Sequence, residues 1–370
     1  MVMKKDTRLS GLPGSRVLAT RVLAVTLLAA GLATSLGAAA ADTEIRVLNW
    51  HGYGTDEKFA TEAFEKQTGI KVVHDYYTSD QEMRTKMVTN PGAYDIVNIN
   101  TQFVPSIEAA GLLQKIDTSK IPNFASISPT LQKHPDITVG GSLYAVPWAW
   151  GINSYAYNTD KIKDNLTSVN ALWDPKYKGR VSVRDDSIYM IGMAALATGQ
   201  DINNPADMPA IKAKLLGLKD QVRAFWGSED EWLKGMAAGT YDMGTMWSGG
   251  AARAVRRYKL PVKFVIPTEG AITWVDTLTI PATSKHADAA AQYINYMLSK
   301  EFYVKWDTEV GAAMSANQAA VDALPADAFN RAVMGTPEVT SRLRFMKPIS
   351  DETRAKYLEL WQEVKTEFVQ

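Results

Sequence analysis

The 370-residue chain contains no cysteine, and this absence removes several kinds of chemistry at once. Disulfide bridges, cysteine zinc sites and thiol nucleophiles are all excluded. Histidine is scarce as well, and the four histidines lie far apart in the sequence with no partner at metal-ligand spacing: His51, His74, His134 and His286. We therefore expect no metal site, and a fold that is held together by its hydrophobic core alone.

Recognisable catalytic motifs are also missing. The sequence has no Gly-x-Ser-x-Gly elbow and no phosphate-binding Gly-x-x-x-x-Gly-Lys-Ser/Thr loop. A partial dinucleotide fingerprint at Gly52 and Gly54 fails because Glu57 stands where the third glycine is required. Carboxylates that meet only in the folded protein leave one catalytic route open, so a carboxylate-dependent enzyme is kept as a minor alternative. No catalytic residue is predicted.

No excess of charge points to a polymeric partner. The chain has 40 basic and 40 acidic residues, of which five basic and one acidic lie in residues 1–41, so the remainder carries a net charge near −4. Nucleic-acid binding, which needs a basic field, is not expected. Hydrophobic residues make up 46% and charged residues 22% of the chain, as in an ordinary globular protein.

The first 41 residues differ in composition from the rest. Five basic residues are followed by an apolar run at residues 22–36 and by the small residues 37–41. This order is typical of a secretory signal peptide, and the apolar run is shorter than the ~20 residues that a membrane span needs. We expect cleavage near Asp42 and a periplasmic protein.

Strand and helix patterns alternate after the signal. Strands are predicted at 45–50, 70–73 and 94–97, and a helix is predicted from a cap at Thr55 to a stop at Gly69. This alternation favours a mostly parallel sheet, in which ligands gather at the carboxyl ends of the strands.

A second unit is predicted after residues 144–148. It contains a strand at 151–158, a helix-rich stretch to about residue 260 and a strand at 274–281. Helices at 286–297 and 357–367 follow. The pattern predicts two α/β lobes.

Aromatic or acidic residues stand at four places beside predicted turns. These places are residues 50–53, 185–186, 246–250 and 274–276. Aromatic faces attract ammonium groups by ~0.5–2 kcal/mol each, and carboxylates add charge-assisted hydrogen bonds. Taken singly, each tryptophan is better explained as a core residue, and Asp185–Asp186 as a solvated turn or a helix cap. Together they indicate a cleft for a cationic chain.

The order of these segments resembles the periplasmic spermidine/putrescine-binding proteins of ABC importers. The similar stretches cover most of the chain beyond the signal: Leu48-Asn49-Trp50 with Tyr53, residues 69–72, 92–97, 111–117, 147–151 and 172–179, and Glu269-Gly270 with Trp274-Val275-Asp276. The resemblance implies a two-lobed α/β fold of the periplasmic-binding-protein type II. A hinge joins the lobes, and the ligand lies in the cleft between them. It implies no cofactor and no catalysis.

The resemblance also implies lobe boundaries and site residues. Lobe 1 is expected at 42–149 plus about 275–320, and lobe 2 at 150–274 plus about 321–370. The residues expected to contact the ligand are Trp50, Tyr53, Asn100, Gln102, Asp186, Tyr189, Trp247, Trp274 and Asp276. Asp186 and Asp276 are expected to hold amines, and Trp247 to lie along the methylene chain.

Three departures from the family pattern leave the ligand open. The position three residues after Asp186 is Tyr189 and the position three residues after Trp247 is Gly250, where family members carry acids. The C-terminal segment offers Arg344, Met346 and Lys347 in place of an uncharged polar residue. A linear polyamine is the first candidate, and an ω-amino acid such as γ-aminobutyrate is the alternative. The expected partners are the small amine and an inner-membrane permease, with the protein itself a monomer.

Overall fold

The computed structural model describes residues 43–369. The predicted signal peptide at residues 1–41 lies outside the described residues. Within residues 43–369, no helix has the length and apolar character of a membrane span.

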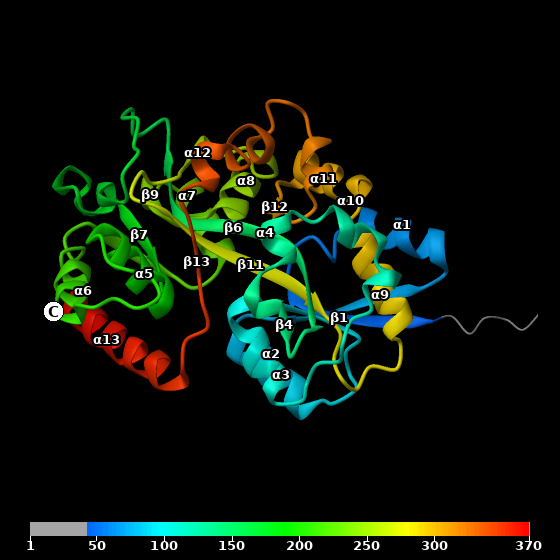
Figure 1. Cartoon of the computed structure of the whole chain (residues 1–370). Coiled ribbons are helices and arrows are strands. Elements are labelled where there is room, and N and C mark those ends of the chain that lie inside the picture. Colours follow the sequence, from blue (N-terminus) through cyan, green and yellow to red (C-terminus); the bar gives the residue numbers. More distant parts are fainter. Residues whose placement is uncertain (1–42, 370) are drawn as a thin grey trace, which may run out of the picture. The chain divides into compact units, whose positions relative to one another are not determined.

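One mixed sheet of eleven strands runs through the described chain (Figure 1). Its main path has the order β2-β1-β3-β11-β6-β9-β7-β8, and a separate hairpin consists of β4 and β5. The strands are β1 (Glu44–Trp50), β2 (Lys71–Tyr77), β3 (Ile96–Asn100), β4 (Thr138–Val139), β5 (Ser142–Leu143), β6 (Ala145–Asn158), β7 (Val181–Arg184), β8 (Val222–Trp226), β9 (Met243–Trp247), β10 (Val262–Val265), β11 (Ala271–Thr279), β12 (Met314–Ser315) and β13 (Leu343–Phe345).

The sheet is parallel at its two flanks and antiparallel at its centre. β1 pairs in parallel with β2 and β3, and β7 pairs in parallel with β8 and β9. The joins of β3 to β11, β11 to β6 and β6 to β9 are antiparallel. The expectation of a mostly parallel sheet is thus met only at the flanks.

Helices surround the two flanks as separate groups. Figure 1 places α1, α2, α3 and α9 on the side of β1, and α5, α6, α7 and α13 on the side of β7. The helices are α1 (Lys58–Thr68), α2 (Asp80–Thr89), α3 (Val104–Ala109), α4 (Pro129–Gln132), α5 (Ser187–Ala197), α6 (Met208–Leu216), α7 (Glu229–Ala237), α8 (Ser248–Arg256), α9 (Ala287–Met297), α10 (Lys300–Lys305), α11 (Gln318–Asp322), α12 (Pro337–Thr340) and α13 (Asp351–Val369). We call the side of β1–β3 the first lobe and the side of β7–β9 the second lobe.

β6 and β11 belong to both lobes. Every residue of β11 is buried, and so are all residues of β6 but the last. Their antiparallel register shifts between Asp276 and Thr277, and such a bulge re-aims the side chains beside it. The expected lobe boundaries, at 149/150 and 274/275, lie inside these shared strands and remain predictions.

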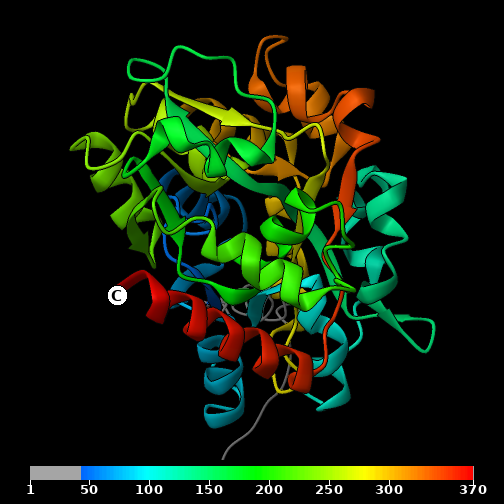
Figure 2. The same cartoon turned by 90° about the vertical axis from the view of Figure 1, so that its left-hand side faces the viewer.

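The C-terminal helix covers one face of the second lobe. Figure 2 shows α13 beside α5, and the two helices pack together. The fully buried Trp361 of α13 donates from Nε1 to Oδ1 of Asp185 at 2.7 Å, and Lys365 pairs with the same carboxylate. Asp185 therefore fastens α13 to the end of β7.

Two local expectations are corrected. Helix α1 begins at Lys58 after Glu57, and Thr55 is not its cap, because the Thr55 hydroxyl accepts a hydrogen bond from Asn49 at 2.9 Å. The stretch to residue 260 holds β7, β8 and β9 as well as helices. These strands have only four or five residues each, too few to show a periodic pattern.

Candidate functional site

Asp276 lies where β11 passes from one lobe to the other. Its carboxylate is 7% exposed and accepts a hydrogen bond from Nδ2 of Asn100 at 2.9 Å. Burial raises the pKa of Asp276 to about 7, and Asp80 adds to the shift while the Asn100 hydrogen bond opposes it. No Lys or Arg within residues 43–369 forms an ion pair with this carboxylate. A buried carboxylate without a cation is costly unless a ligand supplies one.

Tyr53 lies beside Asp276, and three tryptophan rings surround it. Its ring centroid lies 5.2 Å from that of Trp148, 5.8 Å from Trp306 and 6.4 Å from Trp274. The Tyr53 hydroxyl is buried and interacts with the Asp276 carboxylate. Burial first and the Asp276 charge second raise the pKa of Tyr53 well above its ordinary value. Tyr53 and Asp276 thus form a buried polar pair among aromatic rings.

Trp274 lies directly opposite Gly151 across the pairing of β11 with β6. A Cβ atom at residue 151 would lie 2.4 Å from Cζ2 of Trp274 and 2.7 Å from Oγ of Ser248. Only glycine at position 151 leaves room for the Trp274 indole.

Replacing Gly151 with alanine should displace the Trp274 ring. We expect the free energy of unfolding to fall by about 1–3 kcal/mol, because both side chains that meet the new methyl group are buried. Amine affinity, measured by calorimetry, should fall as well. The control is Gly227→Ala after β8, away from the cavity, where the new Cβ finds its nearest neighbour, Oε2 of Glu231, at 3.7 Å. Equal effects of the two substitutions would contradict this role of Gly151.

Trp247 is the last residue of β9. Its indole is fixed by Glu229, which was not predicted from the sequence. Its Nε1 donates to Oε2 of Glu229 at 3.0 Å, and Glu229 forms a bidentate ion pair with Arg253, whose Nε lies 2.6 Å from Oε1. The Arg253 guanidinium is buried and lies 5.9 Å from the Tyr53 ring. A Cβ at Gly250 would lie 2.8 Å from Nε1 of Trp247 and 3.1 Å from Oε2 of Glu229. The Glu229 carboxylate therefore lies close to the position at which family members carry an acid and this chain has Gly250.

Asp186 caps α5 and stands at the second-lobe side of the site. Its Oδ1 accepts from the backbone N–H of Tyr189 at 3.0 Å, and its Oδ2 lies 3.3 Å from Nη2 of Arg184. The Tyr189 hydroxyl donates to the backbone oxygens of Ser154 and Met246 at 2.6 and 3.0 Å. Tyr189 therefore offers its ring as a wall, and its hydroxyl is already committed to the sheet.

Asp80 is a further acid that sequence reasoning missed. It begins α2 in the first lobe, yet the charges that act on it belong largely to the second lobe. Burial and the Asp186 charge raise the pKa of Asp80 to about 6, while Arg184 and Arg354 oppose the rise. In the sequence, the residues after Ser79 look like an ordinary capped helix start, and nothing local marks Asp80 as part of a cleft.

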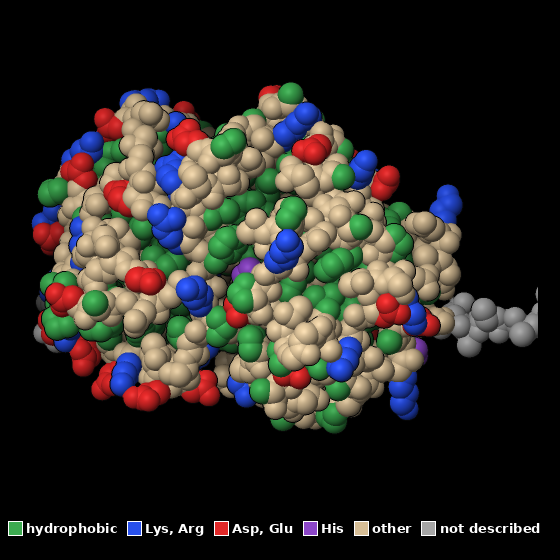
Figure 3. Space-filling view, in the orientation of Figure 1, with side chains coloured by type: hydrophobic (Ala, Val, Ile, Leu, Met, Phe, Trp, Pro, Cys, Tyr) green, Lys and Arg blue, Asp and Glu red, His purple; other side chains and the backbone are tan. Residues whose placement is uncertain are grey.

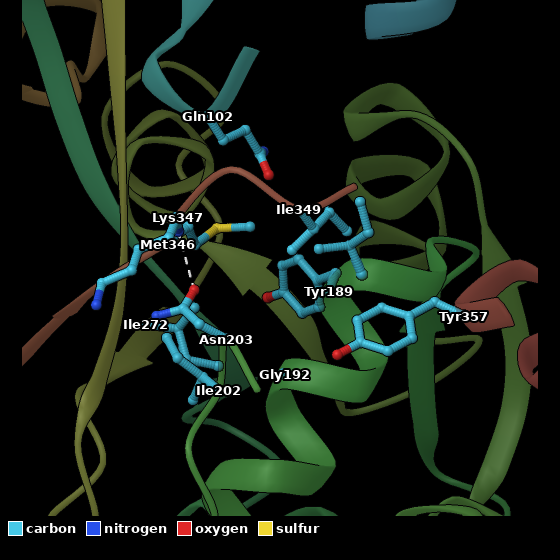
Figure 4. A pocket seen from close by; sticks show the side chains of 11 residues that line it. Gln102, Tyr189, Gly192, Ile202, Asn203, Ile272, Met346, Lys347, Ile349 and Tyr357 are labelled. Atoms are coloured by element: carbon cyan, nitrogen blue, oxygen red, sulfur yellow. Dashed lines mark hydrogen bonds between the residues drawn. The ribbon is translucent and has the colours of Figure 1, made fainter. Parts of the chain in front are cut away.

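A small cavity of about 20 Å³ lies beside this cluster and is lined by both lobes (Figure 4). Gln102 points toward it from the first lobe, and Tyr189 and Met346 line it from the second. The Oε1 atom of Gln102 is buried without a hydrogen-bond partner among residues 43–369. The volume suits about one water molecule, so a larger ligand requires the lobes to part.

Trp50, the remaining predicted residue, lies at the carboxyl end of β1. Its ring packs edge-on against Tyr77 at 4.4 Å and is only partly buried. Trp50, Asn100, Arg184 and Trp247 lie at the carboxyl ends of β1, β3, β7 and β9, where ligands bind in α/β sheets.

On the molecular face seen in Figure 3, basic and acidic side chains are interspersed, without a large field of one sign.

Two lobes that share their central strands, with a buried carboxylate and aromatic rings at the crossing, define a solute-binding protein. The family model named bacterial extracellular solute-binding protein matches residues 60–333. A spermidine/putrescine-binding periplasmic protein of Haemophilus influenzae is 30% identical over 338 residues, which cover 90% of this chain and 91% of that protein. One of Escherichia coli is 34% identical over 279 residues, with 74% and 78% covered.

The fold also matches a solved structure. The spermidine/putrescine ABC transporter substrate-binding protein PotD of Streptococcus pneumoniae aligns with a TM-score of 0.77 at 24% identity, over 88% of this chain and 99% of that one. The chain belongs to the bacterial extracellular solute-binding protein family, and the relatives named above are spermidine/putrescine-binding periplasmic proteins. The resemblance, the fold class and the expectation of a binding protein rather than an enzyme are thereby confirmed.

Proposed function

We propose that this protein captures a linear polyamine of the putrescine/spermidine class and delivers it to the permease of an ABC importer. The observation that carries the proposal is Asp276, a carboxylate 7% exposed with an amide partner and no ion pair within residues 43–369. An ammonium group that enters the cleft would neutralise this charge and form a charge-assisted hydrogen bond. The relatives named above support the same ligand class.

Each part of the cleft has a role in the proposal. Asp276 accepts from the first ammonium group, between the rings of Tyr53 and Trp274. Trp247 covers the methylene chain, and Asp186 faces the second ammonium group from the second lobe. Asn100 orients the Asp276 carboxylate, while Trp50 and Gln102 complete the first-lobe wall and Tyr189 the second-lobe wall.

Ligand binding is proposed to stabilise the closed arrangement of the lobes. Contacts between the lobes include the ion pair of Glu57 before α1 with Arg257 after α8 at 3.1 Å and the Arg354 guanidinium 4.7 Å from the Phe103 ring. A ligand that contacts both lobes shifts the equilibrium toward closure. Small-angle scattering should show a smaller radius of gyration with ligand, and an unchanged radius at saturation would contradict the closure.

A thermal-shift screen tests the ligand class. Putrescine and spermidine should raise the melting temperature, and γ-aminobutyrate should raise it less. One observation favours the ω-amino acid as the second candidate, because Arg184 lies over Trp247 and would meet a carboxylate there. Stabilisation by γ-aminobutyrate alone would replace the polyamine proposal with this second candidate. A ligand recovered chemically unchanged would also separate a binder from an enzyme.

Putrescine affinity should depend on pH through Asp276. The pKa of this group is raised to about 7, so the carboxylate that binds the ammonium is present above pH 7 and is lost as the pH falls. Affinity should therefore decrease about tenfold per unit between pH 7 and pH 5, with Asp80 adding to the loss below pH 6. Calorimetry across this range checks the profile. A flat profile would show that no carboxylate with a raised pKa meets the ligand.

We also propose that the protein is secreted into the periplasm and acts there as a monomer. The signal peptide predicted at residues 1–41 would be removed, and the protein would be released by osmotic shock. N-terminal sequencing should find a chain that starts near Asp42. Met1 on a membrane-bound species would contradict this location.

A further inference from the structure

Arg184 ends β7 and extends toward the Trp247 ring. Its backbone N–H donates to Oγ1 of Thr245 at 2.8 Å, which fixes the strand end beside β9. The guanidinium carbon lies 5.0 Å from the Trp247 ring and 5.7 Å from the Tyr189 ring. Nη2 lies 3.3 Å from Oδ2 of Asp186. A cation of this protein thus lies over two aromatic faces and beside a carboxylate.

These three partners belong to the part of the cleft where the proposed function puts the far end of the ligand: Asp186 faces the second ammonium group, and Trp247 and Tyr189 flank it. A guanidinium and an alkylammonium group compete for the same interactions, since both are attracted to aromatic faces and to carboxylates. Trp226 also contacts the Trp247 ring, with centroids 5.4 Å apart. The indole is therefore already contacted by the core of the second lobe and by Arg184.

Arg184 is held much less firmly than the other arginine of the site. Its side chain is 26% exposed and forms one ion pair, to a carboxylate that is 32% exposed. Arg253, by comparison, is 7% exposed and bound to both oxygens of Glu229. An ion pair that is partly exposed contributes little, so exchange of its cation requires little free energy.

We infer that Arg184 is an internal competitor, which occupies the place of the second ammonium group at Trp247 and Asp186 until the ligand displaces it. The inference rests on the proposed function and names the residue that selects among its ligands. A diamine replaces the guanidinium, and its second ammonium group then forms the contacts with Trp247 and Asp186 that the guanidinium had formed. A monoamine reaches only Asp276 and leaves Arg184 in place.

Calorimetry with putrescine and n-butylamine at pH 7.5 tests the inference. Arg184→Ala should bind putrescine roughly 5- to 30-fold more tightly, because one cation–π contact and one exposed ion pair no longer compete. Binding of n-butylamine should stay within twofold. Arg184→Gln is a second variant with the same expectation, in case the alanine variant folds poorly.

Arg180→Ala is the matched control. Arg180 precedes the same strand, lies 5.7 Å from the Tyr177 ring and pairs with Asp242 at 2.6 Å, away from the cleft. Its loss should leave both affinities unchanged. Unchanged putrescine affinity in both Arg184 variants would overturn the inference, and weaker putrescine affinity would make Arg184 a binding residue. A failure of the proposed function is distinct, because the wild-type protein would then bind neither amine.

Discussion

Replacing Asp276 with asparagine should lower putrescine affinity roughly 30-fold to several thousand-fold. Asparagine keeps the shape and the contact with Asn100 and removes the charge. The loss of one partner from a desolvated charged pair typically costs ~2–5 kcal/mol, which corresponds to this range of dissociation constants. Calorimetry on the wild type and the variant at pH 7.5 measures the difference.

The same substitution should stabilise the ligand-free protein above pH 7. The pKa of Asp276 rises from its ordinary 3.8 to about 7 in the fold, so the folded state binds the proton more tightly than the unfolded chain. The free energy of unfolding therefore falls as the pH rises from about 4 to 7. Above pH 7 the folded protein bears the full cost of burying the ionised Asp276 carboxylate. Asp276→Asn removes it and should raise the free energy of unfolding by on the order of 1–4 kcal/mol at pH 8.

Asp307 provides the matched control for Asp276. It is also a carboxylate 5% exposed, accepts from Nδ2 of Asn330 at 2.6 Å and has its pKa raised by burial. Its asparagine variant should gain stability in the same direction and bind putrescine with wild-type affinity. If both variants bind like the wild type, the amine site has been placed wrongly.

Breaking the Glu229–Arg253 pair should lower both the stability of the protein and its affinity for putrescine. Arg253→Met leaves the Glu229 carboxylate, with 21% of its side chain exposed, without its cation. We expect the free energy of unfolding to fall by about 2–4 kcal/mol, somewhat less than for a fully buried pair. Putrescine affinity should fall roughly 5- to 20-fold, because the acid that anchors Nε1 of Trp247 loses its own support. Urea denaturation and calorimetry give the two values.

The double variant Glu229→Gln with Arg253→Met separates stability from binding. Without either charge, no ion remains unpaired and most of the stability should return. Affinity should stay low, since the charge-assisted anchor of Trp247 is still missing. Recovery of both properties would mean that the pair serves only the fold.

The sequence was sufficient for the features that short segments encode. Asp276 and Trp274 sit in one strand, and the order of such segments predicted the family and the two lobes. The register of β11 with β3 then places Asp276 beside Asn100, a contact that the sequence did not predict. The roles of the nine predicted site residues stay predictions until a ligand is bound.

The missed features depend on contacts between distant segments. Glu229 reaches Trp247 from another element, and Asp80 is influenced by charges of the opposite lobe. The position of Arg184 over Trp247 follows from the pairing of β7 with β9. No local pattern reports such contacts, because each acid or base alone is indistinguishable from a solvated surface charge.

A crystal structure of the secreted protein with putrescine tests the central claim most directly. We expect one ammonium nitrogen within about 2.7–3.0 Å of the Asp276 carboxylate, and the methylene chain against Trp247. The Arg184 guanidinium should then have left the Trp247 ring. A ligand bound elsewhere, or an Asp276 carboxylate without an ammonium partner at saturating putrescine, would contradict the account.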